Sequence, residues 1–197
     1  IIVGLYGLWY VSQNRQSLGA FYWGGLTFSL GVSLVGFGSG YYHWSPNNIT
    51  LVWDRLPMTI GFMGLYAMIV SAFVKTESGV KILPWLVLVG LVSVGYWFIT
   101  ESYGQGDLRW YILVQFLPML LILVILTFFK SPLYNKSKLI LVLAFYAIAK
   151  VLEFFDNQIF EIAYPMSGHS LKHIAAAAAC YYVIDWIKTI NTQQVST

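Results

Sequence analysis

The sequence predicts an all-α, polytopic membrane protein that forms a single seven-transmembrane-helix bundle over residues 1–197. Of its 197 residues, 58% are hydrophobic and only 10% are charged, whereas ordinary soluble domains carry about 25% charged residues. So few charges could not cover the surface of a soluble globule, and a disordered chain has the opposite composition. The aromatic content of 18%, with 8 tryptophans, fits a protein of the lipid bilayer.

Apolar runs of membrane-spanning length follow one another along the whole chain. A hydrocarbon core of about 30 Å needs about 20 helical residues, and helices satisfy their own backbone hydrogen bonds in lipid. The predicted spans are a partial one at 1–12, read as truncated at its N-terminus, and full ones at about 19–42, 51–74, 82–100, 108–129, 139–155 and 168–187. Polar breaks separate them at 13–17, 44–50, 75–81, 101–107, 130–138 and 156–167.

The charges in these breaks predict an orientation. Basic residues occupy alternate breaks and the C-terminus: Arg15, Lys75, Lys81, Lys130, Lys136, Lys138 and Lys188. The other breaks carry Glu101, Asp107, Asp156 and Glu161, with Arg109 at one edge. Because basic loops stay on the cytoplasmic side, the N-terminus is predicted outside and the C-terminus in the cytoplasm.

Two further features of the composition exclude classes of function. The net charge of +3 is dispersed, without the basic run or stripe of a nucleic-acid-binding protein. Cys180 is the only cysteine, which excludes an internal disulfide and a metal site of the Cys-x-x-Cys type.

Ionisable side chains inside predicted spans mark candidate functional positions, because such groups are costly in lipid. They are His43, Asp54, Arg55, Lys150, Glu153, His169, Lys172 and His173, and they include every histidine of the chain. Under the predicted topology, the helix ends that carry His43, Asp54 and the two later histidines all lie near the outer leaflet.

The histidine spacing suggests a metal site. His169 and His173 are four residues apart and share one helix face, and Ser39 and His43 repeat this spacing on the second span. Three neutral imidazoles and a water make a tetrahedral catalytic zinc site, in which the pKa of the water falls to about 7. A His-x3-His pair is more often a packing or interface feature, and His43 alone suits a helix end. The pattern by itself leaves both readings open.

The stretch from Gly38 to Met58 resembles the alkaline ceramidase family, part of the CREST superfamily of seven-helix membrane hydrolases that includes the adiponectin receptors. The family pattern is Ser-x3-His, an aspartate eleven residues after that histidine, and His-x3-His on the last helix. The matching residues are Ser39, His43, Asp54, His169 and His173. All five agree in type, order and spacing, and the number of predicted spans agrees too, so the resemblance covers nearly the whole chain.

The resemblance implies an intramembrane zinc-dependent amidase, which hydrolyses the N-acyl bond of ceramide-like lipids to a sphingoid-type amine and a free fatty acid. It implies that His43, His169 and His173 bind Zn²⁺ while Ser39 and Asp54 act beside the metal. Family members also carry an acidic N-terminal segment that can bind Ca²⁺. This chain begins after any such segment, so no residue is assigned to calcium.

The roles of Asp54 and Ser39 follow from the needs of amide hydrolysis. Asp54 is the candidate general base, which takes a proton from the water and passes it to the leaving amine. Its alternatives are an ion pair with Lys172 or Arg55, or a fourth zinc ligand. Ser39 is expected to bind the developing oxyanion or to orient the water. Its alternative is a helix-interior serine bonded to the carbonyl four residues earlier.

The remaining polar residues are given structural roles. Glu153 and Asp156 share one face of the sixth span with Lys150 one turn deeper, which predicts an ion-pair network among themselves or with Lys172. Cys180 is assigned to packing.

Glycines and tryptophans give two packing predictions. Gly36 and Gly40 lie on the face of Ser39 and His43, so a neighbouring helix is expected to approach there. Tryptophans near span ends are predicted interface anchors: Trp44, Trp53, Trp85, Trp97 and Trp110.

Four hypotheses compete for the function, and we favour the first, the zinc amidase acting on a membrane lipid, with a hydrolase of a different acylated lipid as its variant. The second is a non-enzymatic receptor or signalling protein of the same superfamily with structural zinc. The third is a retinal protein using Lys172, which lies too near a helix end for a buried Schiff base. The fourth is a transporter, for which repeat symmetry is not found.

Overall fold

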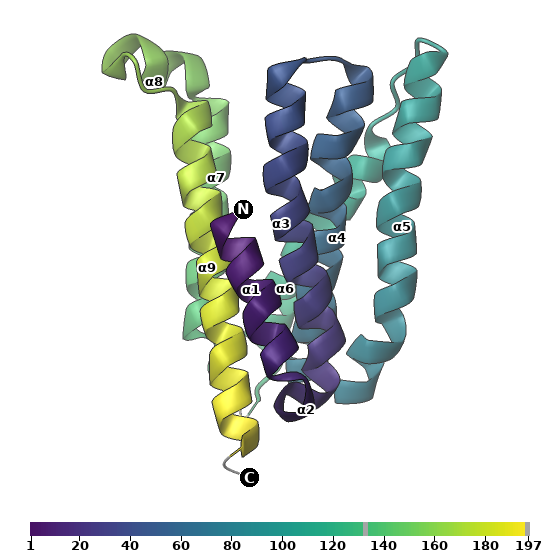
Figure 1. Cartoon of the computed structure of the whole chain (residues 1–197), viewed down its shortest axis with the longest axis vertical. Coiled ribbons are helices and arrows are strands. Elements are labelled where there is room, and N and C mark those ends of the chain that lie inside the picture. Colours follow the sequence, from purple (N-terminus) through teal and green to yellow (C-terminus); the bar gives the residue numbers. More distant parts are fainter. Residues whose placement is uncertain (132–133, 196–197) are drawn as a thin grey trace. The chain divides into compact units, whose positions relative to one another are not determined.

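The computed structural model describes residues 1–131 and 134–195, and every regular element in them is helical. The elements are α1 (Ile2–Gln13), α2 (Arg15–Leu18), the 3-10 turn η1 (Gly19–Phe21), α3 (Tyr22–Trp44), α4 (Asn48–Phe73), α5 (Thr76–Ser102), α6 (Arg109–Phe128), α7 (Ser137–Phe154), α8 (Asp156–Ala163) and α9 (Gly168–Val195), as Figure 1 shows. The predicted all-α class is therefore confirmed for the described part of the chain.

Four helical stretches are long and apolar enough to cross a membrane: Arg15–Trp44, Asn48–Phe73, Thr76–Ser102 and Arg109–Phe128. They confirm the predicted spans at 19–42, 51–74, 82–100 and 108–129 as helices of that kind. The helix α1 has only 12 residues, and α7 carries Lys138, Lys150 and Glu153 within its 18 residues. The seven-span count and the orientation of the termini stay predictions.

Helices extend further into the polar breaks than the sequence suggested. Between α3 and α4, Asn47 caps α4: its side-chain oxygen accepts from the N–H of Ile49 at 2.9 Å and of Thr50 at 3.0 Å. The Thr50 hydroxyl accepts from the N–H of Asn47 at 3.1 Å, which completes a capping box. The predicted break at 156–167 contains α8. Residues 132 and 133 of the break at 130–138 lie outside the described residues.

The chain divides into two compact units, each of which is described by itself. The first comprises Ile1–Tyr134 together with the C-terminal residues from Asn191, and the second comprises Asn135–Ile190. The first unit thus holds α1 to α6 and the end of α9, while α7, α8 and most of α9 form the second. The single-domain assignment stays a prediction.

In the first unit, a row of glycines allows α3 and α4 to pack closely (Figure 1). Gly24, Gly31 and Gly38 are seven residues apart and therefore lie on one face of α3. A Cβ added at Gly31 would lie 2.7 Å from the Cα of Gly61, and one at Gly38 would overlap the carbonyl oxygen of Trp53. The α4 backbone thus occupies the space that a side chain on this face would need.

Pro57 explains the contact at Gly38. Proline has no N–H, so the carbonyl of Trp53, four residues earlier in α4, lacks its helical donor. Gly38 presents only hydrogens to this oxygen, which suits a weak Cα–H···O contact. The end of α3 and the start of α4 are therefore in direct backbone contact at Gly38 and Trp53.

The predicted role of Gly40 is wrong. Nothing among the described residues lies within 4 Å of a Cβ placed there, because Gly40 is about 200° around the helix from Gly38. At Gly36 the predicted close approach is confirmed, because a Cβ there would meet Ile1, the residue directly before α1.

Arg55 lies between two aromatic rings of the first unit. Its guanidinium carbon is 4.1 Å from the ring centroid of Trp97 on α5 and 5.2 Å from that of Tyr111 on α6. Trp97 is only 3% exposed, so the prediction that it anchors the interface is wrong: its ring packs inward under a cation. The other four predicted anchors, Trp44, Trp53, Trp85 and Trp110, are exposed.

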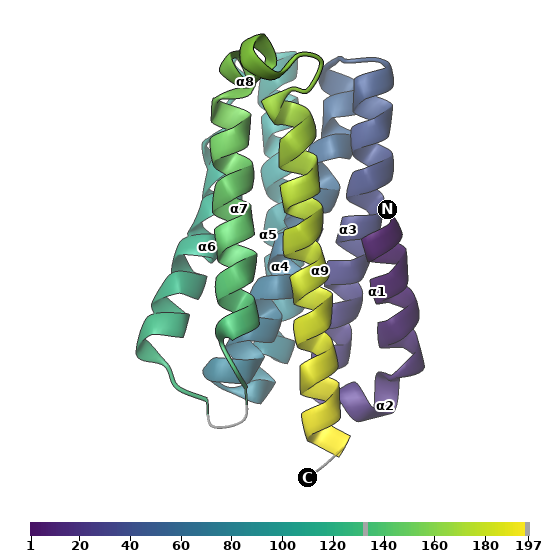
Figure 2. The same ribbon diagram turned by 90° about the vertical axis from the view of Figure 1, so that its left-hand side faces the viewer.

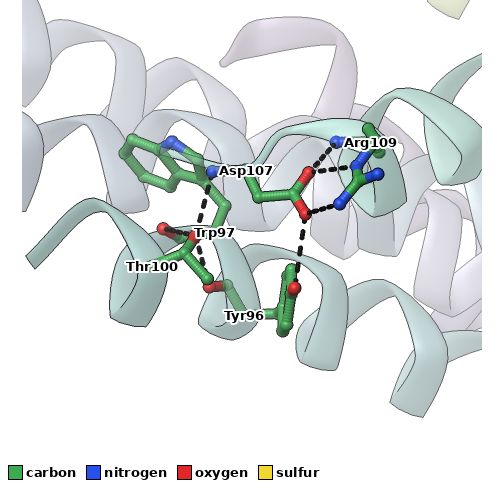
Figure 3. Close-up of polar contacts among 5 residues, drawn as sticks. All are labelled: Tyr96, Trp97, Thr100, Asp107 and Arg109. Atoms are coloured by element: carbon green, nitrogen blue, oxygen red, sulfur yellow. Dashed lines mark hydrogen bonds and ion pairs between the residues drawn. The ribbon is translucent and has the colours of Figure 1, made fainter. Parts of the chain in front are cut away.

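Asp107 organises the connection between α5 and α6 (Figure 3). Its carboxylate accepts from Nη2 of Arg109 at 2.7 Å, from Nε at 2.9 Å and from the backbone N–H at 3.0 Å. The Tyr96 hydroxyl adds a bond at 3.3 Å, and the N–H of Asp107 donates to the Thr100 hydroxyl at 3.0 Å. The hydrogen bonds from Arg109 hold the pKa of Asp107 well below its ordinary value.

In the second unit, α7 and α9 pair antiparallel, and α8 follows α7 at the end where α9 begins (Figure 2). Near the start of α7, Nζ of Lys138 lies 2.6 Å from a carboxylate oxygen of Asp185. Further along, the ring of Phe145 stacks on Tyr182 at a centroid distance of 5.6 Å. This register brings the first turn of α9 beside the junction of α7 and α8.

Candidate metal centre

His169 and His173 face each other on α9. Their Nε2 atoms are 3.1 Å apart, and the two rings meet edge to face with centroids 4.9 Å apart. Two imidazole nitrogens bound to one tetrahedral zinc ion, at about 2.0–2.1 Å each, lie about 3.3 Å from one another. The observed separation fits a shared divalent cation, and it also suits an N–H···N hydrogen bond between the rings.

The helix start that carries His169 is held by two acceptors. The Ser167 hydroxyl accepts from the N–H of Ser170 at 3.0 Å, as a helix N-cap does. The N–H of His169 donates to Oδ1 of Asp156, the first residue of α8, at 2.6 Å. Two N–H groups in the N-terminal turn of α9, which have no acceptors within the helix, thus have side-chain acceptors.

An ion-pair cluster lies next to this turn. Glu153 on α7 accepts from Nζ of Lys150 at 2.8 Å and from Nζ of Lys172 at 2.6 Å. The predicted network is therefore confirmed for these three residues. It is wrong for Asp156, whose carboxylate binds a backbone N–H instead of a lysine. Lys172, which would form the Schiff base in a retinal protein, is ion-paired in this cluster.

Ser39, His43 and Asp54 lie in the first unit, close to the capped turn between α3 and α4. Ser39 and His43 are in the last two turns of α3, and Asp54 is in the second turn of α4. The Cβ position of Gly38 is 3.3 Å from the backbone nitrogen of Asp54, so Ser39 and Asp54 occupy facing turns of this hairpin. Ser39 is 9% exposed, Asp54 is partly buried and His43 is exposed.

Neither Ser39 nor Asp54 makes the structural bonds that were the alternatives to a functional role. Ser33 donates to the carbonyl of Ser29 at 2.9 Å, but the Ser39 hydroxyl has no such bond to any described residue. Within the described chain, the Asp54 carboxylate forms no ion pair with Arg55, whose charge lies over aromatic rings. Polar side chains that lack a hydrogen bond or ion pair in an apolar helix pair are suited to bind water or a ligand.

The five predicted site residues thus form two groups. Ser39, His43 and Asp54 belong to the first unit, and His169 and His173 form a facing pair in the second. The ligand set of three histidines joins residues from both units and stays a prediction, as does the choice between base and fourth ligand for Asp54.

Asp156 and Ser167 were not predicted at the site. Ser167 carries a recognisable signal, since a serine directly before an apolar helix is a typical N-cap. Asp156 carries none, because its partner is a backbone N–H thirteen residues later.

Comparisons with known proteins found no family model, no curated protein and no solved structure that matches the chain. The resemblance to alkaline ceramidases therefore depends on the sequence pattern itself.

Proposed function

We propose that this protein is an intramembrane zinc-dependent amidase that releases a fatty acid from ceramide-like lipids. His169 and His173 supply two zinc ligands, and His43 supplies the third. The observation that carries the proposal is the 3.1 Å separation of the two facing Nε2 atoms, which fits a tetrahedral metal site. The alkaline ceramidase pattern adds the substrate class.

The chemistry divides between the metal and two side chains. When bound, zinc polarises the amide carbonyl and acidifies water. The Asp54 carboxylate accepts a proton from the attacking water and delivers it to the amide nitrogen as the C–N bond breaks. The Ser39 hydroxyl donates a hydrogen bond to the carbonyl oxygen while negative charge develops on it. The hydroxyl of water ends on the acyl carbon, and the amine leaves with the proton.

The placement of Ser39 and Asp54 supports these roles. Both lie at one end of the α3–α4 hairpin, and neither forms a hydrogen bond or ion pair with another described side chain. The charges of α7 are paired with each other or with α9, as ionisable groups inside membranes usually are. We propose on this basis that α7 and α9 also lie in the bilayer. The alternation of basic residues between the predicted breaks supports the proposed orientation, with the N-terminus outside and the C-terminus in the cytoplasm.

The test measures zinc content and fatty-acid release with the full chain purified in detergent. His43→Ala, His169→Ala and His173→Ala are each expected to lose zinc and hydrolysis of a ceramide panel. Asp54→Asn is expected to keep zinc and to lose about 10²–10⁴-fold in turnover. Glu161→Gln, which changes an exposed carboxylate of α8 in the same way, is expected to behave as wild type.

Each outcome separates the alternatives. Full activity in any one histidine variant contradicts the ligand set, and zinc loss in Asp54→Asn makes Asp54 a ligand. Zinc binding without hydrolysis of amides or esters favours the receptor with structural zinc. Release of fatty acid only from other acylated lipids keeps the hydrolase and replaces the substrate.

A further inference from the structure

We propose that Asp156 is a positioning residue for the histidine pair: its carboxylate fixes the first turn of α9 so that His169 and His173 face one cation. The inference rests on the proposed metal site and deepens it. It concerns residues of the second unit alone.

The position of His169 makes such support necessary. His169 is the second residue of α9, which begins at Gly168. Helix ends fray because their first N–H groups have no helical acceptor. A ligand at this place can hold a metal only if the terminal turn stays wound, since unwinding would separate its ring from that of His173 one turn later.

Asp156 meets this need directly. The hydrogen bond from the N–H of His169 to Oδ1 of Asp156 is 2.6 Å long and charge-assisted. It joins the backbone of the ligand residue itself to the start of α8. A carboxylate at this place also favours the helix electrostatically, because the N-terminus carries a partial positive charge.

Two neighbouring contacts fix the same turn against the α7–α8 junction. A Cβ added at Gly168 would lie 2.8 Å from the Cα of Asp156 and would overlap the carbonyl of Leu152. One turn further, Lys172 pairs with Glu153 at 2.6 Å. Residues 168, 169 and 172 thus all contact residues 152–156, and the contact of Asp156 acts on the backbone of a proposed ligand residue.

The experiment uses the full chain in detergent and two measurements. Affinity for Co²⁺ or Zn²⁺ is measured by competition with a chromophoric chelator. Hydrogen exchange of the metal-free protein is followed at peptides that cover the start of α9. The variants are Asp156→Ala, Asp156→Asn, which keeps an acceptor oxygen, and Glu161→Ala. The last is a matched control on the same helix, because Glu161 is exposed and its carboxylate forms no hydrogen bond or ion pair with a described residue.

Asp156→Ala is expected to weaken metal affinity by about tenfold or more and to speed exchange only in the first turn of α9. Asp156→Asn should keep most of the wild-type metal affinity and most of the protection from hydrogen exchange. Glu161→Ala should match wild type in both measurements. If the alanine variant does not fold, Asp156→Ser carries the same expectation, because its hydroxyl is uncharged and its oxygen is one bond closer to the backbone than Oδ1 of Asp156.

Wild-type affinity in Asp156→Ala and Asp156→Ser would overturn the inference. So would an equal loss in Asp156→Asn and Asp156→Ala, since the hydrogen bond would then not be the cause. A wild-type protein that binds no metal refutes the proposed amidase instead. In that case the role of Asp156 is decided by hydrogen exchange at the start of α9 in Asp156→Ala. Exchange unchanged from wild type refutes this role, and faster exchange supports stabilisation of the helix start by Asp156.

Discussion

Replacing Gly38 with alanine tests whether backbone contact between α3 and α4 supports the proposed site. The new Cβ would overlap the carbonyl oxygen of Trp53 and lie 2.7 Å from its carbonyl carbon, whereas ordinary contact begins at 3.4 Å. These atoms belong to the α4 backbone and cannot turn aside as a side chain would. Relieving the contact with the carbonyl carbon alone requires a local separation of about 0.7 Å, from 2.7 Å to 3.4 Å, and clearing the overlapped oxygen requires more. This separation would occur next to Ser39 and Asp54.

The size of the effect follows from two opposing terms. Extra volume in a packed interface costs about 1–3 kcal/mol, while exchanging glycine for alanine within a helix gains about 1 kcal/mol. Gly40→Ala, on the same helix, receives the same gain without the clash because nothing described lies within 4 Å of its Cβ. The difference in unfolding free energy between the two variants should thus be about 1–3 kcal/mol, with Gly38→Ala the less stable.

The assay is reversible denaturation in mixed micelles followed by tryptophan fluorescence, with fatty-acid release measured alongside. We expect Gly38→Ala to lose hydrolysis more strongly than Gly40→Ala, because its clash lies at the turn that carries Asp54. Gly95→Ala on α5, where the Cβ position is also open, serves as a second control. Equal stability of the Gly38 and Gly40 variants would refute the close approach of the two helices.

Two further contacts of the first unit give predictions. In a double-mutant cycle of Arg55→Gln and Trp97→Leu, unfolding in micelles should show a coupling free energy of about 1 kcal/mol from the cation–π contact, and additive losses would contradict it. Arg109→Gln should raise the pKa of Asp107 toward its ordinary value, because the hydrogen bonds that lower it are removed. In the wild type the stabilisation from this carboxylate is present above its ordinary pKa and is lost as pH falls through the lowered value. In the variant the folded and unfolded pKa values approach each other, so this pH-dependent stabilisation should largely disappear. Carboxyl ¹³C NMR titration would detect the raised pKa of Asp107.

Helical spans were predictable because lipid imposes a simple rule on composition and length. The four stretches that are long and apolar enough to cross a membrane were all anticipated, with ends that differ from the predicted ones by one to six residues. The ends depend on local hydrogen bonds: the capping box of Asn47 and Thr50 starts α4 inside the predicted break. The glycine face of α3 was placed on Gly36 and Gly40 because of their spacing to the histidine. Gly36 does meet the start of α1, but Gly40 has no close neighbour, and the face that packs on α4 carries Gly24, Gly31 and Gly38. The partner helix and its proline decide which face is covered.

The same distinction applies to the candidate site. A contact between two side chains could be predicted from residue types and spacing, whereas a contact between a side chain and the backbone could not. The His169–His173 pair was readable because spacing fixes which side chains share a helix face, and the 3.1 Å contact agrees with it. Asp156 was assigned to an ion-pair network from its charge, yet its carboxylate binds the backbone of His169. Every residue except proline offers a backbone N–H, so residue types do not reveal this partner; only the meeting of the α7–α8 junction with the start of α9 selects it. Residues that perform chemistry can therefore be proposed from sequence, whereas those that hold them in place emerge only once helix ends are located.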